Sequence, residues 1–202
     1  MNESLWHPDL TPIQNKHLLS YIQKEYDKPK RYYHNFDHIA EMLILGLKIF
    51  DINKMQYMAI AFHDIVYDTT KTDNEEKSAN VMLNWQLDNV DKLDEILTAR
   101  EMAFAITIIG DTKGHFIASD YDSPIVLDLD LERLSRPYPE VDEYSKLIRL
   151  EYEHVDGNVF REGRRKFFED LLSRGSIMQT DFGRKNWEPA IRRNAALSLL
   201  DL

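Results

Sequence analysis

The sequence predicts an all-helical fold for this 202-residue chain. Apolar residues recur at helical spacing along most of the chain, and residues typical of helix starts precede several of these segments. One stretch, residues 126–131, alternates like a strand, but no other segment offers it a partner strand. At 23.8 kDa the chain is long enough for one substantial core and short for two. We therefore expect one bundle-like domain spanning residues 1–202.

Four helices are expected in the first part of the chain. Thr11 and Pro12 are typical of the N-cap and the first position of a helix. Asp73 and Glu76 have the spacing of a capping box, in which the two side chains bond each other's backbone amides. The expected helices cover residues 11–26, 35–50, 54–63 and 73–87.

The second part of the chain is expected to continue with helices 91–107, 123–134, 140–154, 160–172 and 186–200. The strand-like stretch is assigned to the second of these because Ser123 and Pro124 form a good helix start. On a helix, Asp128 and Asp130 point about 200° apart, so both cannot serve the same atom equally.

Composition excludes several classes of partner and site. The formal charge of −10 opposes binding to duplex nucleic acid, whereas a small phosphorylated substrate can still be held by a metal and a few placed cations. No apolar run approaches the roughly 20 residues of a membrane span, and residues 1–6 lack the features of a secretory signal. We therefore expect a cytoplasmic protein without a membrane partner. Because cysteine is absent, any metal must be held by histidines and carboxylates.

Polar side chains interrupt apolar runs at three places. An apolar run beginning at Ala59 leads into His63 and Asp64. Burying such a doublet costs several kcal/mol unless a charge compensates it, and a divalent metal does so well. The other two places hold His34 and His38, and Asp128 and Asp130.

Taken in order, these residues resemble the H…HD…D signature of the HD superfamily of metal-dependent phosphohydrolases. The sequence is similar to one bacterial branch of predicted HD phosphohydrolases, over about residues 31–174. The similar blocks are Arg31-Tyr32-Tyr33-His34-Asn35, Phe62-His63-Asp64-Ile65-Val66-Tyr67-Asp68, Asn74-Glu75-Glu76-Lys77-Ser78-Ala79, Thr112-Lys113-Gly114-His115, Leu127-Asp128-Leu129-Asp130-Leu131 and Arg149-Leu150-Glu151-Tyr152. The resemblance implies an HD-type helical bundle.

The resemblance also implies a set of metal ligands, namely His38, His63, Asp64 and Asp128. It leaves Asp130 as a supporting residue, for example a partner for a ligating histidine. Two imidazoles and two carboxylates suit Mn²⁺, Mg²⁺, Fe²⁺, Co²⁺, Ni²⁺ or Zn²⁺, and the sequence does not choose among them.

Three carboxylates are candidates for accepting a proton during catalysis: Asp64, Asp68 and Glu75. Their order of preference cannot be read from the sequence. Glu75 also lies in the first turn of an expected helix, where a carboxylate stabilises the helix dipole without any catalytic role.

Four further residues are candidates for binding substrate: His34, Lys113, His115 and Arg149. Lys113 and His115 share a short polar turn, which is either a phosphate site or a solvated loop. Arg149 is suited to a forked phosphate contact, and the competing interpretation is an ion pair with Glu151, Glu153 or Asp130. His34 is a helix cap, a substrate contact or a surface residue. The remaining cations, Arg161, Arg164, Arg165 and Lys166, are expected to face mostly outward into solvent.

The expected function is metal-dependent hydrolysis of a small phosphorylated substrate, a nucleotide phosphomonoester or phosphoanhydride. One alternative is an HD-type dinuclear iron oxygenase, for which His34, Glu75 and His115 would supply further ligands. Another is a non-catalytic, nucleotide-binding HD domain. The sequence gives no oligomeric state.

Overall fold

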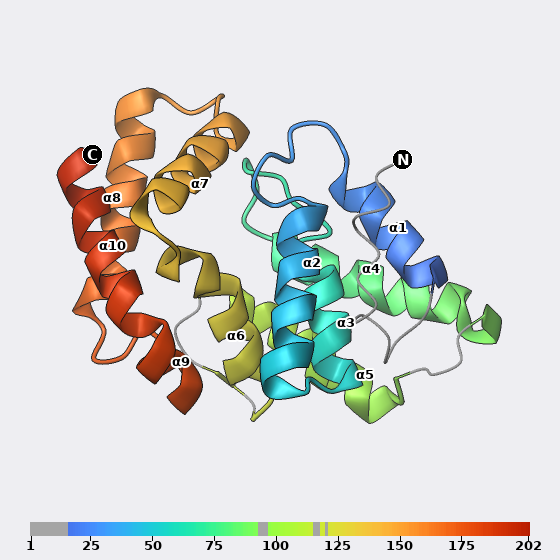
Figure 1. Ribbon diagram of the computed structural model, residues 1–202. Coiled ribbons are helices and arrows are strands. Elements are labelled where there is room, and N and C mark those ends of the chain that lie inside the picture. The colour runs from blue at the N-terminus through green and yellow to red at the C-terminus, as the bar shows by residue number, and fades with distance from the viewer. Residues whose placement is uncertain (1–15, 93–96, 115–117, 120) are drawn as a thin grey trace.

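A computed structural model of the chain describes residues 16–92, 97–114, 118–119 and 121–202. Within these ranges every regular element is helical and none is a strand, which confirms the all-α prediction (Figure 1). The longer helices are α1 (Lys16–Tyr26), α2 (Phe36–Leu45), α3 (Lys54–Phe62), α4 (Asn74–Asp88), α5 (Ala99–Thr112), α6 (Ser123–Leu131), α7 (Tyr138–Glu151), α8 (Gly157–Ser173), α9 (Asp181–Asn186) and α10 (Glu188–Asp201). Short helical turns are η2 (Gly46–Phe50), η3 (Val90–Lys92) and η4 (Glu132–Ser135).

Helix α3 lies at the centre of the core. Every residue from Gln56 to Phe62 is buried, as expected for a helix that is apolar on most sides. Asn53 starts it with a complete capping box, in which its side chain and that of Gln56 bond each other's backbone amides. Because α3 packs against α2, α4, α5 and α6, its last turn delivers His63 to a point that several helices surround.

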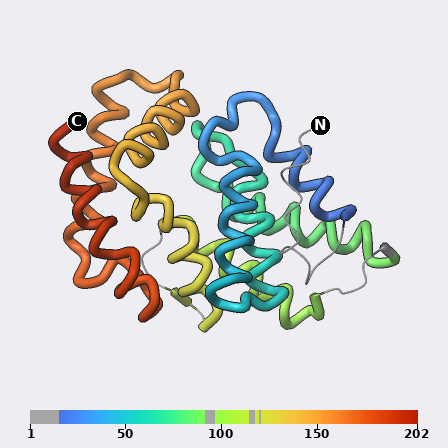
Figure 2. The backbone as a smooth tube through the Cα atoms, in the orientation of Figure 1, coloured from blue at the N-terminus to red at the C-terminus, as the bar shows by residue number. Residues whose placement is uncertain are grey.

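Helix α6 lies between two groups of helices. In Figure 1, α1 to α5 form one side of the molecule and α7, α8 and α10 form the other. The backbone tube in Figure 2 shows the same division, with the blue-to-green part of the chain beside the orange-to-red part. Side chains on different faces of α6 can therefore reach different parts of the chain.

Most helices start close to the predicted positions, whereas the cap of α4 and the start of α5 differ for local reasons. Asn35 caps α2 by accepting a hydrogen bond from the His38 amide at 3.2 Å. Helix α4 begins at Asn74 as expected, but Asp73 makes no capping bond, because its carboxylate pairs instead with Lys77 at 2.9 Å. Helix α5 does not continue from residue 91: it begins at Ala99, after an extended Thr98.

The remaining differences lie near the chain ends. The expected cap at Thr11 and Pro12 lies outside the described residues. Helix α9 was not expected from the sequence, and it begins where the Thr180 hydroxyl accepts a hydrogen bond from the Gly183 amide. In the ranges that the structure describes, no helix is both long and apolar enough to cross a membrane.

Candidate metal centre

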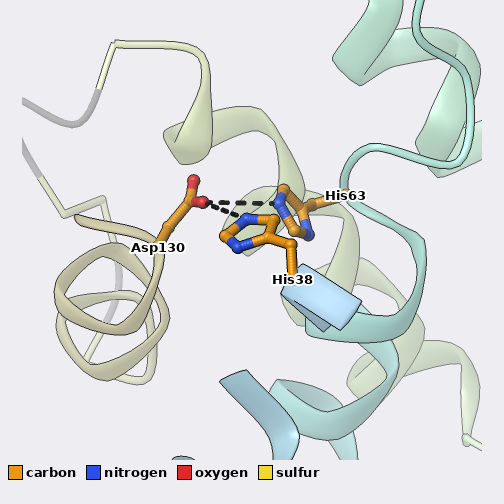
Figure 3. Close-up of side chains that lie close together, drawn as sticks. All are labelled: His38, His63 and Asp130. Carbon is orange, nitrogen blue, oxygen red and sulfur yellow. Dashed lines mark hydrogen bonds and ion pairs between the residues drawn. The ribbon is translucent and has the colours of Figure 1, made fainter. Parts of the chain in front are cut away.

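Three side chains from three helical segments converge at the C-terminal end of α3. His38 comes from α2, His63 follows α3 directly, and Asp130 comes from α6 (Figure 3). Oδ1 of Asp130 lies 2.9 Å from Nε2 of His38 and 3.6 Å from Nε2 of His63. One nitrogen or oxygen of each residue lies within 4.8 Å of the others, a spacing that a single metal ion can bridge. Both histidine side chains are only 1% exposed.

The hydrogen bond of His63 determines which nitrogen faces the cluster. Its Nδ1 donates to the carbonyl of Ile60 at 3.0 Å, so in the neutral ring Nε2 carries the lone pair. This Nε2 is buried without a hydrogen-bond partner, and it lies 3.3 Å from Oδ2 of Asp64. A lone pair that faces carboxylates requires a cation, either a proton or a metal. Burial lowers the pKa of His63, but Asp64 and Asp130 outweigh burial and raise it well above its usual value.

His38 also presents a nitrogen toward the carboxylate of Asp130. The ring of Tyr33 stacks on it, with centroids 5.4 Å apart, and Nδ1 is buried without a hydrogen-bond partner. Burial, the largest effect, lowers the pKa of His38 and favours the neutral form that a metal ligand needs. Two imidazoles and a carboxylate are a donor set that fits a divalent ion.

Asp64 lies beside this cluster but is not one of its three members. Its backbone is held on both sides: the amide donates to the Tyr26 hydroxyl at 3.2 Å, and the carbonyl accepts from Arg31 at 2.5 Å. Arg31 also donates to the carbonyl of Ile65 at 2.6 Å, so one guanidinium fixes the turn after α3. Burial raises the pKa of Asp64, but His63 outweighs burial, and the net direction is downward.

Asp128, expected as a ligand from the resemblance, lies on a different face of α6. Its Oδ1 accepts from the Gln179 amide at 2.6 Å, and its Oδ2 accepts from the Thr180 amide at 2.9 Å and hydroxyl at 2.6 Å. Gly183 of α9 lies so close that an added Cβ would collide with Oδ2. Asp130 therefore lies opposite the histidines and pairs with His38, whereas Asp128 is placed apart from them and holds the segment before α9.

No family model, curated protein or solved structure matches the chain. The resemblance to the HD superfamily therefore rests on the motif residues and on this geometry. An all-helical chain with a buried His-His-Asp cluster is compatible with an HD-like fold.

A cavity of about 550 Å³ lies against the cluster. His63, Asp64 and Asp130 line it, together with three of the residues expected to act on substrate: His34, Glu75 and Lys113. The structure therefore brings together side chains from the first, middle and last parts of the described chain.

His34 is held in the cavity wall by Glu151. Its Nδ1 donates to Oε2 of Glu151 at 2.7 Å, and its ring stacks on Tyr67 with centroids 4.1 Å apart. Oε1 of Glu151 accepts hydrogen bonds from three successive amides, those of residues 32, 33 and 34. This buried carboxylate positions the segment before α2. From the sequence, Glu151 was expected only as a possible ion-pair partner of Arg149.

Lys113 and Glu75 both line the cavity and form an ion pair with each other. Nζ of Lys113 is 3.5 Å from Oε2 of Glu75 and also donates to the carbonyl of Thr72. Asp68 is placed elsewhere: it is exposed, accepts from the amide and hydroxyl of Thr70, and lines a different cavity of about 470 Å³. His115 lies outside the described residues.

Arg149 is not among the residues that line this cavity. Its guanidinium donates to the carbonyls of Tyr152 and Val155 after the end of α7, and it lies 5.0 Å above the ring of Phe160. The structure places it in neither expected role, since it contacts main-chain oxygens and not a carboxylate. Arginine near a helix C-terminus satisfies carbonyls that the helix leaves unpaired.

Arg164 of α8, which was expected in solvent, lines the cavity. Its guanidinium lies 4.9 Å from the ring of Phe167 and 4.7 Å from that of Phe168. A sequence signal existed: residue 164 lies four after Phe160 and three before Phe167, which places it on the same face as these apolar residues.

Proposed function

We propose that this protein is a metal-dependent phosphohydrolase that acts on a small phosphorylated substrate, a nucleotide phosphomonoester or phosphoanhydride. The observation that carries the proposal is Nε2 of His63. It is buried, lacks a hydrogen-bond donor and faces the carboxylates of Asp64 and Asp130 at one end of the cavity. Such an arrangement favours a bound divalent cation.

Three side chains would hold the ion: Nε2 of His38, Nε2 of His63 and Oδ1 of Asp130. The carboxylate of Asp64, 3.3 Å from His63 Nε2, is the nearest candidate for a fourth ligand. When bound, the ion would supply Lewis-acid activation of water and of a phosphoryl oxygen. Its identity among Mn²⁺, Mg²⁺, Fe²⁺, Co²⁺, Ni²⁺ and Zn²⁺ is left to metal analysis.

The other polar residues of the cavity have distinct proposed roles. Lys113 neutralises negative charge on a phosphate, since it lines the cavity. Glu75 and Asp64 are the two candidate proton acceptors that line this cavity, and Asp68 is not retained because it lines another. His34, oriented through Nδ1 by Glu151, contacts the substrate from the opposite end of its ring.

The two alternatives gain no specific support. A dinuclear oxygenase needs a second group of ligands, and in the ranges that the structure describes the candidate group is His38, His63 and Asp130 alone. Two further ligands that it would require, His34 and Glu75, are paired with Glu151 and Lys113. A non-catalytic binding domain is separated from an enzyme by the experiment below.

Phosphate release tests the proposal directly. The purified chain, stripped with chelator, is reloaded with each of the six metals and incubated with nucleoside mono-, di- and triphosphates and with phenyl phosphate. We expect metal-dependent release from at least one substrate, and its loss in His63→Ala. Saturating metal occupancy without release from any substrate would contradict the proposal and favour the binding domain.

A further inference from the structure

We infer that Arg164 binds the anionic group of the ligand that occupies this cavity, and that the organic part of that ligand is aromatic or otherwise apolar. The inference rests on the proposed function of the same cavity and specifies its substrate class: phosphate esters with an aryl or nucleoside-like group. Small hydrophilic phosphates are disfavoured.

The first argument is that Arg164 has no anionic partner among the described residues. Within the described chain it forms neither an ion pair nor a hydrogen bond, and its contacts are the faces of Phe167 and Phe168. Burial lowers its pKa from the usual value for arginine. A partly buried guanidinium that lacks a partner among the described residues is unfavourable, and a ligand anion would compensate it through paired hydrogen bonds.

The second argument is that the titratable side chains acting on Arg164 are phenols and not carboxylates. Tyr33, Tyr67 and Tyr152 line the same cavity and lie near enough to Arg164 to influence its pKa. Burial raises the pKa of Tyr67 far above its usual value, so this phenol stays protonated at neutral pH. Such phenols can donate hydrogen bonds to an anion but cannot neutralise the arginine.

The third argument is the apolar wall of the cavity that Arg164 lines. Ligand cavities commonly combine an apolar lining with a few placed polar groups, and a volume of about 550 Å³ is within the usual range of about 300–1,000 Å³. Burying apolar surface against an aromatic ring of the ligand contributes favourable binding free energy, whereas a hydrophilic ligand buries little such surface. The wall is formed by Leu131, Leu134, Ile148, Val155, Val159, Phe160 and Phe167.

Two phosphonates test the inference without hydrolysis, because their carbon–phosphorus bond replaces the ester. Binding of phenylphosphonate and methylphosphonate is measured by calorimetry on the full chain as purified, and again after metal removal with EDTA. We expect phenylphosphonate to bind roughly tenfold more tightly than methylphosphonate. Arg164→Gln should weaken both by roughly tenfold, with or without metal.

Arg161→Gln is the matched control, since it removes the same charge from the same helix at an exposed position. It should leave both affinities unchanged. Equal affinities of wild type and Arg164→Gln, an equal loss in Arg161→Gln, or equal binding of the two phosphonates would overturn the inference.

A second measurement covers the case in which Arg164→Gln does not fold. Wild-type protein is treated with phenylglyoxal, which modifies arginines, and the modified residues are mapped by mass spectrometry. Phenylphosphonate should protect Arg164 and leave Arg161 reactive; unchanged modification of Arg164 would contradict the inference. If Arg164-dependent binding is found but no substrate releases phosphate, the binding site stands and the hydrolase proposal fails, so the two outcomes are distinguishable.

Discussion

Asp128 and Asp130 lie two residues apart on α6, yet they meet opposite surroundings. Both oxygens of Asp128 are occupied by donors from Gln179 and Thr180, and its side chain holds the segment before α9. Asp130 faces Nε2 of two histidines, accepting a hydrogen bond from His38, and also lines the cavity. The difference teaches that a carboxylate bound by main-chain amides serves the fold, whereas one grouped with imidazole nitrogens can serve as a metal ligand.

The two arginines repeat this contrast. Arg149 donates to two carbonyls at the end of α7, whereas Arg164 lies in the cavity wall without such partners in the described chain. Residue type is the same in each pair, so the partners determine the role. The predictions below test this contrast from the largest expected effect to the smallest.

The largest expected effect is the loss of phosphohydrolase activity when Asp130, on the cavity-facing side of α6, is substituted. Asp130→Asn should lower metal-dependent phosphate release by at least about 100-fold, because the charge that binds the ion is lost. Asp128→Asn has the same chemistry and should retain most activity per folded molecule. The measurement is kcat/KM for both variants, with the folded fraction determined by circular dichroism. Similar losses in the two variants would break the contrast.

Asp128→Ala should instead lower stability. It removes three hydrogen bonds to a buried carboxylate and leaves two amides of the 179–180 segment without their acceptor. We expect a loss of about 3 kcal/mol in the free energy of unfolding. Urea unfolding followed by tryptophan fluorescence measures it. Wild-type stability in this variant would mean that Asp128 does not hold the segment.

Gly183→Ala probes the same contact from the other side. Its new methyl group would collide with Oδ2 of Asp128 and would lie 3.0 Å from Cβ of Met178. The expected cost is about 1–3 kcal/mol. In the double variant with Asp128→Ala the cost should shrink, because the colliding oxygen is gone. Strictly additive costs would show that the two residues are not coupled.

Arg149→Ala should lower the free energy of unfolding by about 1–2 kcal/mol, since two carbonyls lose their donor and Phe160 loses a cation–π contact. Its kcat/KM per folded molecule should equal that of wild type. A normal melting temperature combined with a tenfold loss of kcat/KM would instead return Arg149 to the substrate site.

The pH dependence of stability should reveal Glu151, a further carboxylate held by the main chain. Burial raises its pKa, but hydrogen bonds from His34 and from successive amides outweigh burial and lower it. The unfolded chain therefore binds the proton more readily, so the contribution of Glu151 is present above its unfolded pKa of about 4.5 and is lost as pH falls through the lower folded value. The stability difference between wild type and Glu151→Gln should narrow over that interval. A difference that does not depend on pH would contradict this account.

The local pattern of apolar and helix-capping residues was sufficient to predict much of the fold. The apolar run of α3 and the capping residue Asn53 belong to one short segment, so the helix that delivers His63 is encoded locally. Helix α9 was missed because it is only six residues long and begins with a tertiary contact to α6.

The site was harder to predict, because long-range partners decide it. The alternation of apolar and acidic residues around Asp128 and Asp130 indicates that the two side chains lie on different faces of the helix. The amides that donate hydrogen bonds to Asp128, however, lie about fifty residues later in the chain. The same holds for His34, which is positioned by Glu151 from α7. Helical spacing could have placed Arg164 on an apolar face, yet it could not show that this face borders a cavity.

Metal content of an isosteric pair of variants tests the central claim most directly. Wild type, Asp128→Asn and Asp130→Asn are purified alike, loaded with Mn²⁺, desalted and analysed by inductively coupled plasma mass spectrometry. If His38, His63 and Asp130 hold the ion, wild type and Asp128→Asn should carry about one ion per folded chain, and Asp130→Asn should carry little. Loss of the ion from Asp128→Asn together with full occupancy in Asp130→Asn would contradict the account.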